Sequence, residues 1–565
     1  MTPKTHSGID FLADIPTDEG LIFLPLGGSG EIGMNLNLYC HRGAWLMIDC
    51  GVTFGDESTP GIDVLMPDPA FIVERREALA GMVLTHAHED HIGAVPYIWP
   101  MLRCPVFATA FTAEVLRAKL AEAGLEDEVE IGEVPQSGRF EVGPFAIELI
   151  TLTHSIPEPN AVVVRTSAGV VLHTGDWKLD PDPLVGSTSD IDALRRVGDE
   201  GVLAVVGDST NAMVEGGAVS EAVVAENLIE VIGSCEGRVA VACFASNIAR
   251  LQSIARAAAA HDRSVALVGR SLWRITEAAR ATGYLEDVPA FLTEHDVGYL
   301  PDDKVLMICT GSQGEPRAAL SRIARGEHQA ISFRPGDTVI FSSRIIPGNE
   351  LPIGRLQNQL AALGVTIVDE RSALVHVSGH PNKGDLEQMY HWVRPQIAVP
   401  VHGEHRHMAA HAELALACQV PHAPTIENGV VLRLAPGAPE VLGTVKTGRL
   451  AVDGRKLIPL DGDIARRRKQ MLWNGSLMAT LVLDGSGRLA ASPRLSAPGL
   501  LDDTSEDAAL QDRAIKAMED WLEAMGDEKR RDDQLVGEFV RRKLRRFFKD
   551  HRGKRPPTSV HVVRI

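Results

Sequence analysis

The segment from His86 to His91 packs three imidazoles and a carboxylate of metal-ligand type into six positions. The apolar residues 81–84 predict the end of a buried strand, and residues 92–96 begin the next element, so these side chains are expected on a strand-to-helix turn. In an extended segment His86 and His88 point the same way, whereas Asp90 and His91 lie past the bend. One short loop could therefore supply two metal positions.

More candidate ligands follow apolar, strand-like runs further along the chain. They are His154, Asp176 and His402. The alternative interpretation is that a histidine-rich segment is a solvated loop or holds structural histidines, and it requires no further sites of this kind. Nitrogen and oxygen ligands without thiolates suit zinc or manganese, and the sequence does not choose between them.

Composition limits the kinds of protein that could carry these residues. The 565 residues suffice for two or three domains, and 45% apolar with 23% charged residues is typical of a soluble globular protein. The N-terminus lacks the apolar core of a secretion signal, no run reaches membrane-spanning length, and seven cysteines without a C-x-x-C pair fit a reducing compartment. These features predict a cytoplasmic protein.

Residues 28–33, Gly-Ser-Gly-Glu-Ile-Gly, fit the G-x-G-x-x-G pattern of dinucleotide-binding folds, and Asp49 lies at about the spacing of a ribose-binding acid. That fingerprint requires a helix after the third glycine. Residues 34–40 instead alternate like a strand. The glycines are therefore expected to form a tight hairpin beside the active site.

The order His-x-His-x-Asp-His, then a His, an Asp and a late His, resembles the metallo-β-lactamase superfamily of binuclear hydrolases. The resemblance implies one zinc on His86, His88 and His154 and another on Asp90, His91 and His402, with Asp176 bridging. Asp49 matches a carboxylate that supports the metal site. Two such cations would lower the pKa of a shared water and neutralise charge on a scissile phosphate or carbonyl.

A large insertion separates Asp176 from His402, and its alternating helical and strand-like stretches, such as residues 249–256 and 265–269, predict an α/β domain with a parallel sheet. Its markers resemble the beta-CASP insert of nucleic-acid-processing metallo-β-lactamases, with Asp208 in motif A, His380 in motif B and His402 in motif C. In that family a histidine at motif C accompanies RNA substrates. The implied fold is α/β: a metallo-β-lactamase αββα sandwich with an inserted beta-CASP α/β domain and a small C-terminal α+β domain.

Four further strings, at residues 244–247, 310–316, 346–350 and 376–380, resemble the bacterial ribonuclease J family over roughly residues 20–450. The family implies a pocket for a nucleotide phosphate, which here would be lined by Ser246, Asn247, His376 and Ser378. One position departs from the pattern. Many members carry a histidine after residues 246–248, and this chain has Ala249.

The expected domains are residues 1–205 and 373–450 for the two parts of the metallo-β-lactamase domain, 206–372 for the insertion, 451–470 for a linker and 471–565 for the C-terminal domain. That last domain should contain a strand, a turn and a strand from residue 477 to 489, then helices over 508–525 and 534–549. The second helix carries six basic residues, which suit an oligomer interface and RNA contact equally.

The resemblance implies a metal-dependent ribonuclease of RNA decay and maturation, including rRNA processing. It would cleave phosphodiesters as a 5′-to-3′ exonuclease and as an endonuclease, and would prefer 5′-monophosphate ends. Asp90, Asp208 and His380 are the candidate catalytic residues, and two Zn²⁺ ions are the expected cofactors, with Mn²⁺ or Mg²⁺ also able to support activity. The net charge of −19 speaks against a protein that coats nucleic acid but is compatible with a nuclease that binds RNA with modest affinity.

Two other classes stay open at this point. One is a different hydrolase of the same fold, acting on DNA, an ester or a thioester, and the large insertion argues against small substrates. The other is a non-catalytic scaffold of an RNA-decay assembly, which would be expected to have lost ligands. The expected partners are RNA, further copies of the chain in a homodimer or homotetramer, and RNA-decay proteins, and no membrane association is expected.

Overall fold

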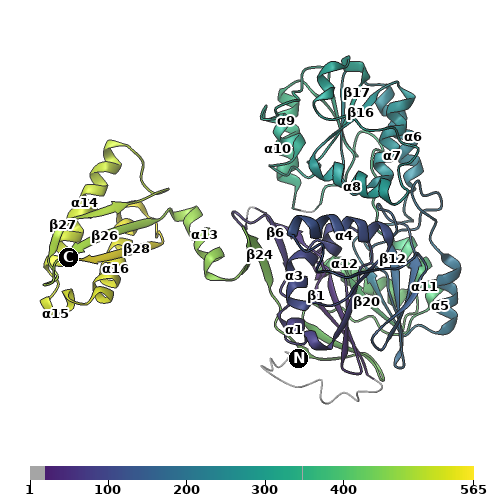
Figure 1. Ribbon diagram of the computed structural model, residues 1–565, viewed down its shortest axis with the longest axis horizontal. Coiled ribbons are helices and arrows are strands. Elements are labelled where there is room, and N and C mark those ends of the chain that lie inside the picture. The colour runs from purple at the N-terminus through teal and green to yellow at the C-terminus, as the bar shows by residue number, and fades with distance from the viewer. Residues whose placement is uncertain (1–19, 57, 347) are drawn as a thin grey trace. The chain divides into compact units, whose positions relative to one another are not determined.

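The structure is a computed structural model that describes residues 20–565 apart from Glu57 and Pro347 (Figure 1). The N-terminal residues used to judge a secretion signal, and the proline of the 346–350 string, lie outside the described part. Contacts between residues divide the chain into two compact units. Of the described residues, the first contains 20–53 and 66–447, and the second contains 54–65 and 448–565.

The first unit contains two β-sheets that share one apolar core. Eight strands form the first sheet in the order β23-β22-β1-β3-β4-β7-β8-β9. Their bounds are β1 Leu21–Gly27, β3 Leu36–His41, β4 Ala44–Ile48, β7 Leu79–Val83, β8 Val106–Ala108, β9 Ile131–Glu133, β22 Val430–Ala435 and β23 Glu440–Thr444.

Six strands form the second sheet in the order β10-β11-β12-β13-β14-β20. Their bounds are β10 Arg139–Val142, β11 Phe145–Thr151, β12 Asn160–Thr166, β13 Gly169–His173, β14 Ala204–Asp208 and β20 Ile397–Val401. Phe23 and Ile48 of the first sheet belong to the same buried cluster as Leu149 and Val399 of the second. The two sheets therefore pack face to face.

Helices cover the outer faces of both sheets. On the first sheet they are α1 Ala70–Val73, α3 Val95–Leu102 and α4 Ala110–Ala123, and on the second α5 Ile191–Glu200, α11 Lys383–Val393 and α12 His405–Ala417. Phe71 of α1 packs edge-on against Trp45 of β4, and Leu194 and Trp392 join the buried cluster on the outer side of the second sheet. The expected αββα sandwich is confirmed.

The insertion is a separate five-stranded sheet in the order β16-β17-β15-β18-β19, and all its recorded pairings are parallel. Its strands are β15 Val239–Ala242, β16 Ser264–Val268, β17 Val305–Cys309, β18 Thr338–Phe341 and β19 Thr366–Val368, and its main helices are α6 Glu221–Gly233, α7 Ile248–Ala260, α8 Arg270–Ala281, α9 Ala319–Ala324 and α10 Glu350–Ala362. Parallel neighbours need crossover connections, and the helices supply them. The expected α/β domain is confirmed, with the expected helix near 249–256 and strand near 265–269 in place.

The expected start of the insertion, at residue 206, lies inside β14. That strand pairs with β13 and β20 through Asp208, so the second sheet of the sandwich continues past the expected boundary. Apolar residues 204–206 are followed by Gly207 and Asp208, which are turn-forming residue types, so the sequence suggested an end of the strand that comes two residues too early.

The second unit begins with structure where the sequence suggested a linker. Residues 451–470 contain most of β24 Arg449–Asp453, all of β25 Lys456–Pro459 and the first part of α13 Asp463–Asn474. The two strands form a four-stranded sheet with β5 Thr53–Phe54 and β6 Val64–Pro67. Pairing with a strand from residues 64–67 is a long-range contact, so the local sequence did not indicate it.

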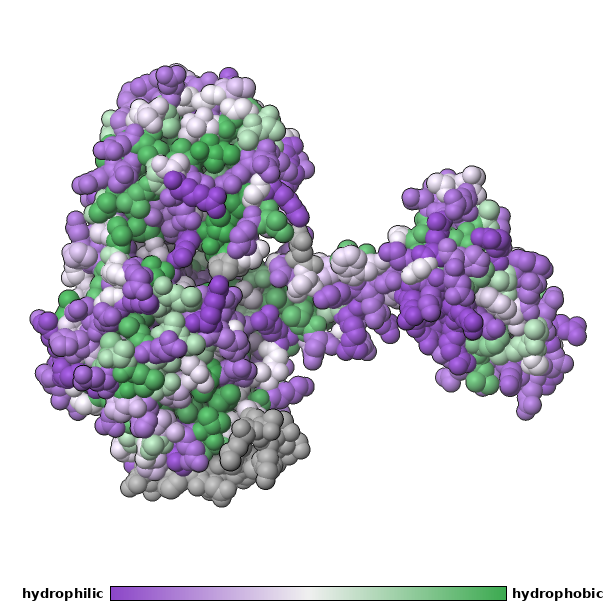
Figure 2. Space-filling view, turned by 180° about the vertical axis from the view of Figure 1, so that it is seen from behind, coloured by the Kyte–Doolittle hydropathy of each residue, from purple (hydrophilic) through white to green (hydrophobic). Residues whose placement is uncertain are grey.

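The C-terminal part of this unit has three strands, β26 Leu477–Leu483, β27 Leu489–Ser496 and β28 Thr558–Arg564, with helices α14 Ser505–Glu523 and α16 Asp533–Arg552. The strand, turn, strand and two helices agree with the sequence, which missed β28. On α16 the buried residues Val536, Val540, Leu544 and Phe548 recur every four positions, and this spacing leaves the basic residues on the outside. Hydrophilic side chains cover most of the face of this unit shown in Figure 2.

Candidate metal centre

The histidine motif lies on the turn that follows β7, as its spacing predicts. Thr85 to His88 lie outside any helix or strand, with a bend at Ala87 and an extended backbone at His88, and the short helix α2, Glu89–Ile92, begins after His88. The backbone oxygens of Asp90 and His91 accept hydrogen bonds from the amides of Asn35 and Cys50 at 3.0 and 2.7 Å. These bonds tie the turn to the neighbouring strands of the first sheet.

Three imidazole nitrogens meet at one point beside this turn. His88 Nδ1 lies 3.0 Å from His86 Nε2 and 3.1 Å from His154 Nε2. Asp176 Oδ2 lies 3.9 Å from each of those two Nε2 atoms. These four residues offer ligand atoms that all lie within 4.8 Å of one another.

A second group forms on the other side of Asp176. Its Oδ2 atom is 3.2 Å from His91 Nε2, and Asp90 Oδ2 is 3.1 Å from His402 Nε2. Asp90, His91, Asp176 and His402 again present ligand atoms within 4.8 Å. Asp176 thus belongs to both groups, and this is the arrangement expected of a bridging carboxylate.

The outer nitrogens of four histidines have polar partners, which fixes the ring orientations. His86 Nδ1 lies 3.0 Å from Thr85 Oγ1, His91 Nδ1 2.7 Å from Asp49 Oδ2, His154 Nδ1 2.5 Å from Gly379 O and His402 Nδ1 2.8 Å from Thr210 Oγ1. A partner on one ring nitrogen leaves the other as the inward-facing lone pair. Asp49 is therefore placed as a support for His91 and not as a member of either ligand group.

The electrostatics of the two groups suit cations. Burial and then the neighbouring imidazoles of His91 and His88 hold the pKa of His86 well below its ordinary value, so this ring is a neutral donor. Burial alone would lower the pKa of His91, but the carboxylates of Asp176 and Asp90 outweigh it and raise the pKa well above its ordinary value. The second position therefore attracts positive charge.

One more observation supports a metal at this place. Asp176 Oδ1 is buried and has no hydrogen-bond partner among the described residues. An orphaned carboxylate oxygen is costly unless a cation or a ligand satisfies it. Nitrogen and oxygen donors in two adjoining groups fit a pair of divalent transition-metal ions.

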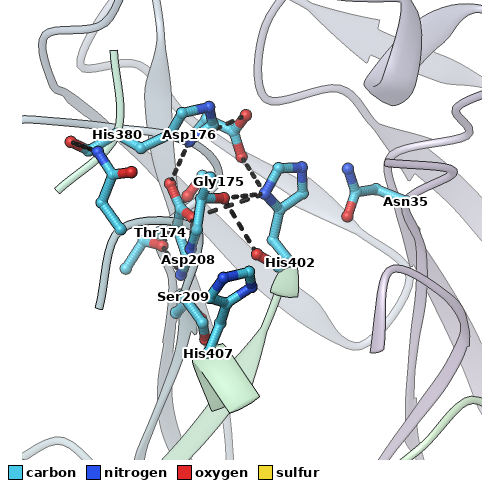
Figure 3. Close-up of polar contacts among 12 residues, drawn as sticks. Asn35, Thr174, Gly175, Asp176, Asp208, Ser209, His380, His402 and His407 are labelled. Carbon is cyan, nitrogen blue, oxygen red and sulfur yellow. Dashed lines mark hydrogen bonds and ion pairs between the residues drawn. The ribbon is translucent and has the colours of Figure 1, made fainter. Parts of the chain in front are cut away.

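Asp208 and His380 lie together next to the second group (Figure 3). Asp208 ends β14, and its Oδ2 atom is 2.7 Å from His380 Nδ1. The ring of His380 stacks on that of His402 with centroids 5.5 Å apart. The side chain of His380 is 21% exposed, whereas that of Asp208 is fully buried, so His380 is the member that a substrate can reach.

The side chains of the four residues expected to bind a phosphate do not form a single hydrogen-bonded group. Ser378 Oγ accepts hydrogen bonds from Asn211 Nδ2 and from the His380 amide at 2.9 and 3.2 Å. Asn247 caps α7, where its side chain accepts from the Arg250 amide. Within the described part of the chain, no hydrogen bond joins the side chains of Ser246, Asn247, His376 and Ser378 to one another.

Sequence reasoning missed several residues that contact the site. Asn35 Nδ2 donates to Asp90 O at 3.0 Å and lies 3.1 Å from His91 Nε2. Thr210 supports His402, and the buried Asn211 joins the loop after β14 to the segment that carries Ser378. Asn35 closely follows the glycine pattern of residues 28–33, and this position in the chain was the only feature of the sequence that pointed to Asn35 as a residue near the site.

The glycine-rich segment forms a hairpin loop, as expected. β1 pairs antiparallel with β3, and residues 28–35 connect them without the helix of a dinucleotide site. Gly28 O accepts from the amide of His402, and Ser29–Gly30 pairs with Gly403–Glu404, so the loop holds His402 in place. A Cβ at Gly27 would lie 1.9 Å from Met34 O, which excludes any other residue there.

Four parts of the chain match known families. Residues 44–221 match the family described as beta-lactamase superfamily domain, 236–360 ribonuclease J, beta-CASP domain, 364–420 Zn-dependent metallo-hydrolase RNA specificity domain and 464–565 ribonuclease J C-terminal domain. A protein named ribonuclease J from Sinorhizobium meliloti is 45% identical over 98% of this chain and 99% of its own length. A ribonuclease J of Thermus thermophilus is 39% identical over 81% of each chain.

A solved structure shares the fold at low sequence identity. A protein of unknown function from Enterococcus faecalis superposes with a TM-score of 0.52 at 14% identity, over 73% of this chain and all of its own. Among the described residues, no helix is long and apolar enough to cross a membrane. The fold, the clustered metal-ligand groups and the full-length similarity together show that this chain belongs to the ribonuclease J family, whose members are metal-dependent ribonucleases of the metallo-β-lactamase and beta-CASP type.

Proposed function

We propose that this chain cleaves RNA as a 5′-to-3′ exonuclease and as an endonuclease in RNA decay and maturation, including that of ribosomal RNA, with preference for 5′-monophosphate ends. The observation that carries the proposal is the pairing of two ligand groups through Asp176 with an adjacent, partly exposed His380. Two metal positions alone would suit many hydrolases, whereas His380 adds a proton carrier where the substrate enters.

His86, His88 and His154 would hold one ion, Asp90, His91 and His402 the other, and Asp176 would bridge them. We assign zinc to both positions because the donors are nitrogen and oxygen in groups of four, and Mn²⁺ or Mg²⁺ could support activity. Such ions supply Lewis acidity toward the phosphate and lower the pKa of an attacking water.

The Asp208–His380 pair would handle the proton that the leaving 3′-oxygen requires. Asp208 holds His380 Nδ1, so Nε2 is the nitrogen left to act on the substrate. Burial alone would lower the pKa of His380, but Asp208 and Asp176 raise it above its ordinary value, which favours the protonated acid. The products would be a 3′-hydroxyl and a 5′-phosphate.

The preference for a 5′-monophosphate would come from the segment that contains His376 and Ser378, aided by Ser246 and Asn247. Ser378 is anchored by Asn211 and adjoins His380, so a phosphate bound there would lie close to the metal groups. A pocket sized for one phosphate would crowd a triphosphate. The loss of several hydrogen bonds to a charged group would then cost a few kcal/mol, on the order of a hundredfold in rate.

The test uses one RNA with three different 5′ ends: monophosphate, hydroxyl and triphosphate. We expect the purified chain with Mn²⁺ to degrade the monophosphate form fastest and to release 5′-monophosphate nucleotides. The variant Ser378→Ala with His376→Ala should lose this preference and still cut internally. Equal rates on all three ends of the wild type would contradict end sensing, and no cleavage of any RNA would contradict the proposed activity.

Assembly into a homodimer or homotetramer, and contacts with other RNA-decay proteins, are also part of the proposal. Helix α13 has no buried residue in the described structure, and Leu472 and Trp473 are 60% and 67% exposed. An exposed tryptophan and leucine on one helix indicate a surface that another chain covers. A second copy of this chain is the partner that we assign to it.

A further inference from the structure

Arg344 reaches from the inserted domain to the loop that carries Asp208. It lies three residues beyond the end of β18, at the carboxyl edge of the parallel sheet. Its Nη1 atom donates to Asn211 Oδ1 at 2.8 Å, and Asn211 follows Asp208 by three residues. Ligands bind at the carboxyl edge of open parallel sheets, so the location suits a substrate contact.

The orientation of Asn211 fixes where the guanidinium lies. Asn211 is 2% exposed, and its Nδ2 atom donates to Ser378 Oγ at 2.9 Å, with longer contacts to His380 O and Asn382 Oδ1. Because the amide nitrogen faces those acceptors, Oδ1 must face Arg344. The arginine is thus attached to the group that joins the Asp208 loop to the His380 segment.

The backbone around Arg344 is held as well. Gln313 is 5% exposed, and its Nε2 atom donates to Arg344 O at 2.8 Å while its Oε1 atom accepts from the Ile346 amide at 2.9 Å. A side chain on a fixed backbone with a fixed partner loses little entropy when it binds a ligand. Arg344 is therefore preorganised.

The charge of Arg344 is not neutralised by a neighbour. Its side chain is exposed, one of its five N–H groups is used, and no carboxylate among the described residues lies within ion-pair distance of it. By contrast Arg334, which precedes the same strand at its other end, pairs with Asp302 at 3.0 Å. An arginine that has no ion-pair partner and lies beside a site for a polyanion is well placed to bind a phosphate.

We infer that Arg344 binds a backbone phosphate of the RNA next to the cleaved bond and so sets affinity for the substrate from the side of the inserted domain. The inference rests on RNA cleavage at the metal centre. A guanidinium can offer two parallel N–H groups to one phosphate, and the bond to Asn211 leaves enough donors for that contact. Because the chain has a net charge of −19, an arginine without an ion-pair partner at this position should contribute strongly to RNA binding.

The experiment compares wild type with Arg344→Gln, which removes the charge but keeps an N–H donor for Asn211. We expect KM for a single-stranded RNA to rise roughly 10- to 100-fold while kcat stays within about twofold. The plot of log kcat/KM against log salt concentration should become shallower by about 0.7, the value for one lost phosphate contact on a single strand. Metal content should not change.

Arg334→Gln is the matched control, because it removes an exposed arginine from the other end of the same strand, and its KM and salt slope should equal those of the wild type. An unchanged KM in Arg344→Gln, a raised KM with an unchanged salt slope, or a fall in kcat alone would overturn the inference, the last by showing that Arg344 only positions Asn211. RNA cleavage by the wild type separates these outcomes from failure of the proposed function, which would overturn both.

Discussion

Four of the five histidines proposed as metal ligands depend on a residue outside the ligand set. Thr85, Asp49 and Thr210 hold the outer nitrogens of His86, His91 and His402, and a backbone oxygen holds that of His154. Because these partners fix which nitrogen carries the lone pair, they determine whether the ligands are neutral donors. The geometry of the candidate ligands therefore depends on the histidines themselves and on the residues that hydrogen-bond to them.

Removal of a proposed ligand should abolish activity without unfolding the chain. We expect His86→Ala and Asp176→Asn to reduce RNA cleavage by roughly a hundredfold or more, because each removes a metal-ligand atom from the centre of a ligand group. Bound metal, measured by mass spectrometry after dialysis, should fall below that of the wild type. His405→Ala is the control, since this histidine is near His402 in sequence and has a side chain that is 70% exposed. Near wild-type cleavage by either ligand variant would refute the two-metal assignment.

Asn35 should matter for the second metal position alone. Its amide nitrogen must face Asp90 O, an acceptor, so the group acts as a donor beside His91 and not as a ligand. Asn35→Ala should weaken metal binding at this position and slow cleavage, each by about 10- to 100-fold. Loss of a residue that hydrogen-bonds to metal ligands typically has an effect of this size. Titration with Mn²⁺ should show one weakened site. Asn227→Ala on α6 should leave both sites intact, and two equally weakened sites in Asn35→Ala would contradict the assignment.

At the scale of elements, the site depends on where strands end. His86 lies three residues after the end of β7, Asp208 is the last residue of β14, and His402 directly follows β20. β14 and β20 are parallel neighbours, so their carboxyl ends lie side by side although about 190 residues separate them. The parallel pairing is what brings His402 to the other candidate ligands.

The inserted domain is tied to the 373–380 segment by a buried ion pair. Arg250 is fully buried, bonds Glu221 at 2.8 Å and donates to the backbone oxygens of Ser342 and Val375 at 3.0 Å. Arg250→Met should lower the free energy of unfolding by about 3–5 kcal/mol, because it leaves a carboxylate buried without its partner. Urea denaturation followed by circular dichroism measures the change. The double variant with Glu221→Met should recover part of the loss, and equal losses in both would contradict this account.

At the scale of the whole molecule, local spacing predicted the grouping of His86, His88 and His91 on one turn, and alternating helical and strand-like stretches predicted the α/β insertion. The sandwich was implied by the resemblance to metallo-β-lactamases. It did not predict that β24 and β25 would pair with a strand near residue 65, or that β28 would complete the C-terminal sheet, since both are long-range pairings with weak local signals. Asn211 and Thr210 were missed for the same reason. Their roles come from contacts with residues roughly 170–190 positions away.

The prediction at this scale concerns assembly. Leu472→Asp and Trp473→Asp place charge on the exposed apolar surface of α13 and should reduce the mass of the protein in solution, because a desolvated carboxylate is costly at an interface. Light scattering measures the mass, and the metal content should be unchanged. Tyr299→Asp alters a side chain that is 87% exposed in the inserted domain and serves as control. An unchanged mass in the α13 variants would exclude this surface as the contact between copies.

The place of His402 in the chain also orders events during synthesis. Asp176 and His402 are separated by roughly 225 residues, which a ribosome takes about 10–50 seconds to add. Until His402 has left the ribosome, the second ligand group lacks a member, and the nascent chain cannot complete its metal centre. If His402 is a metal ligand as proposed, we expect the chain to remain inactive toward its own message during most of the time in which it is made.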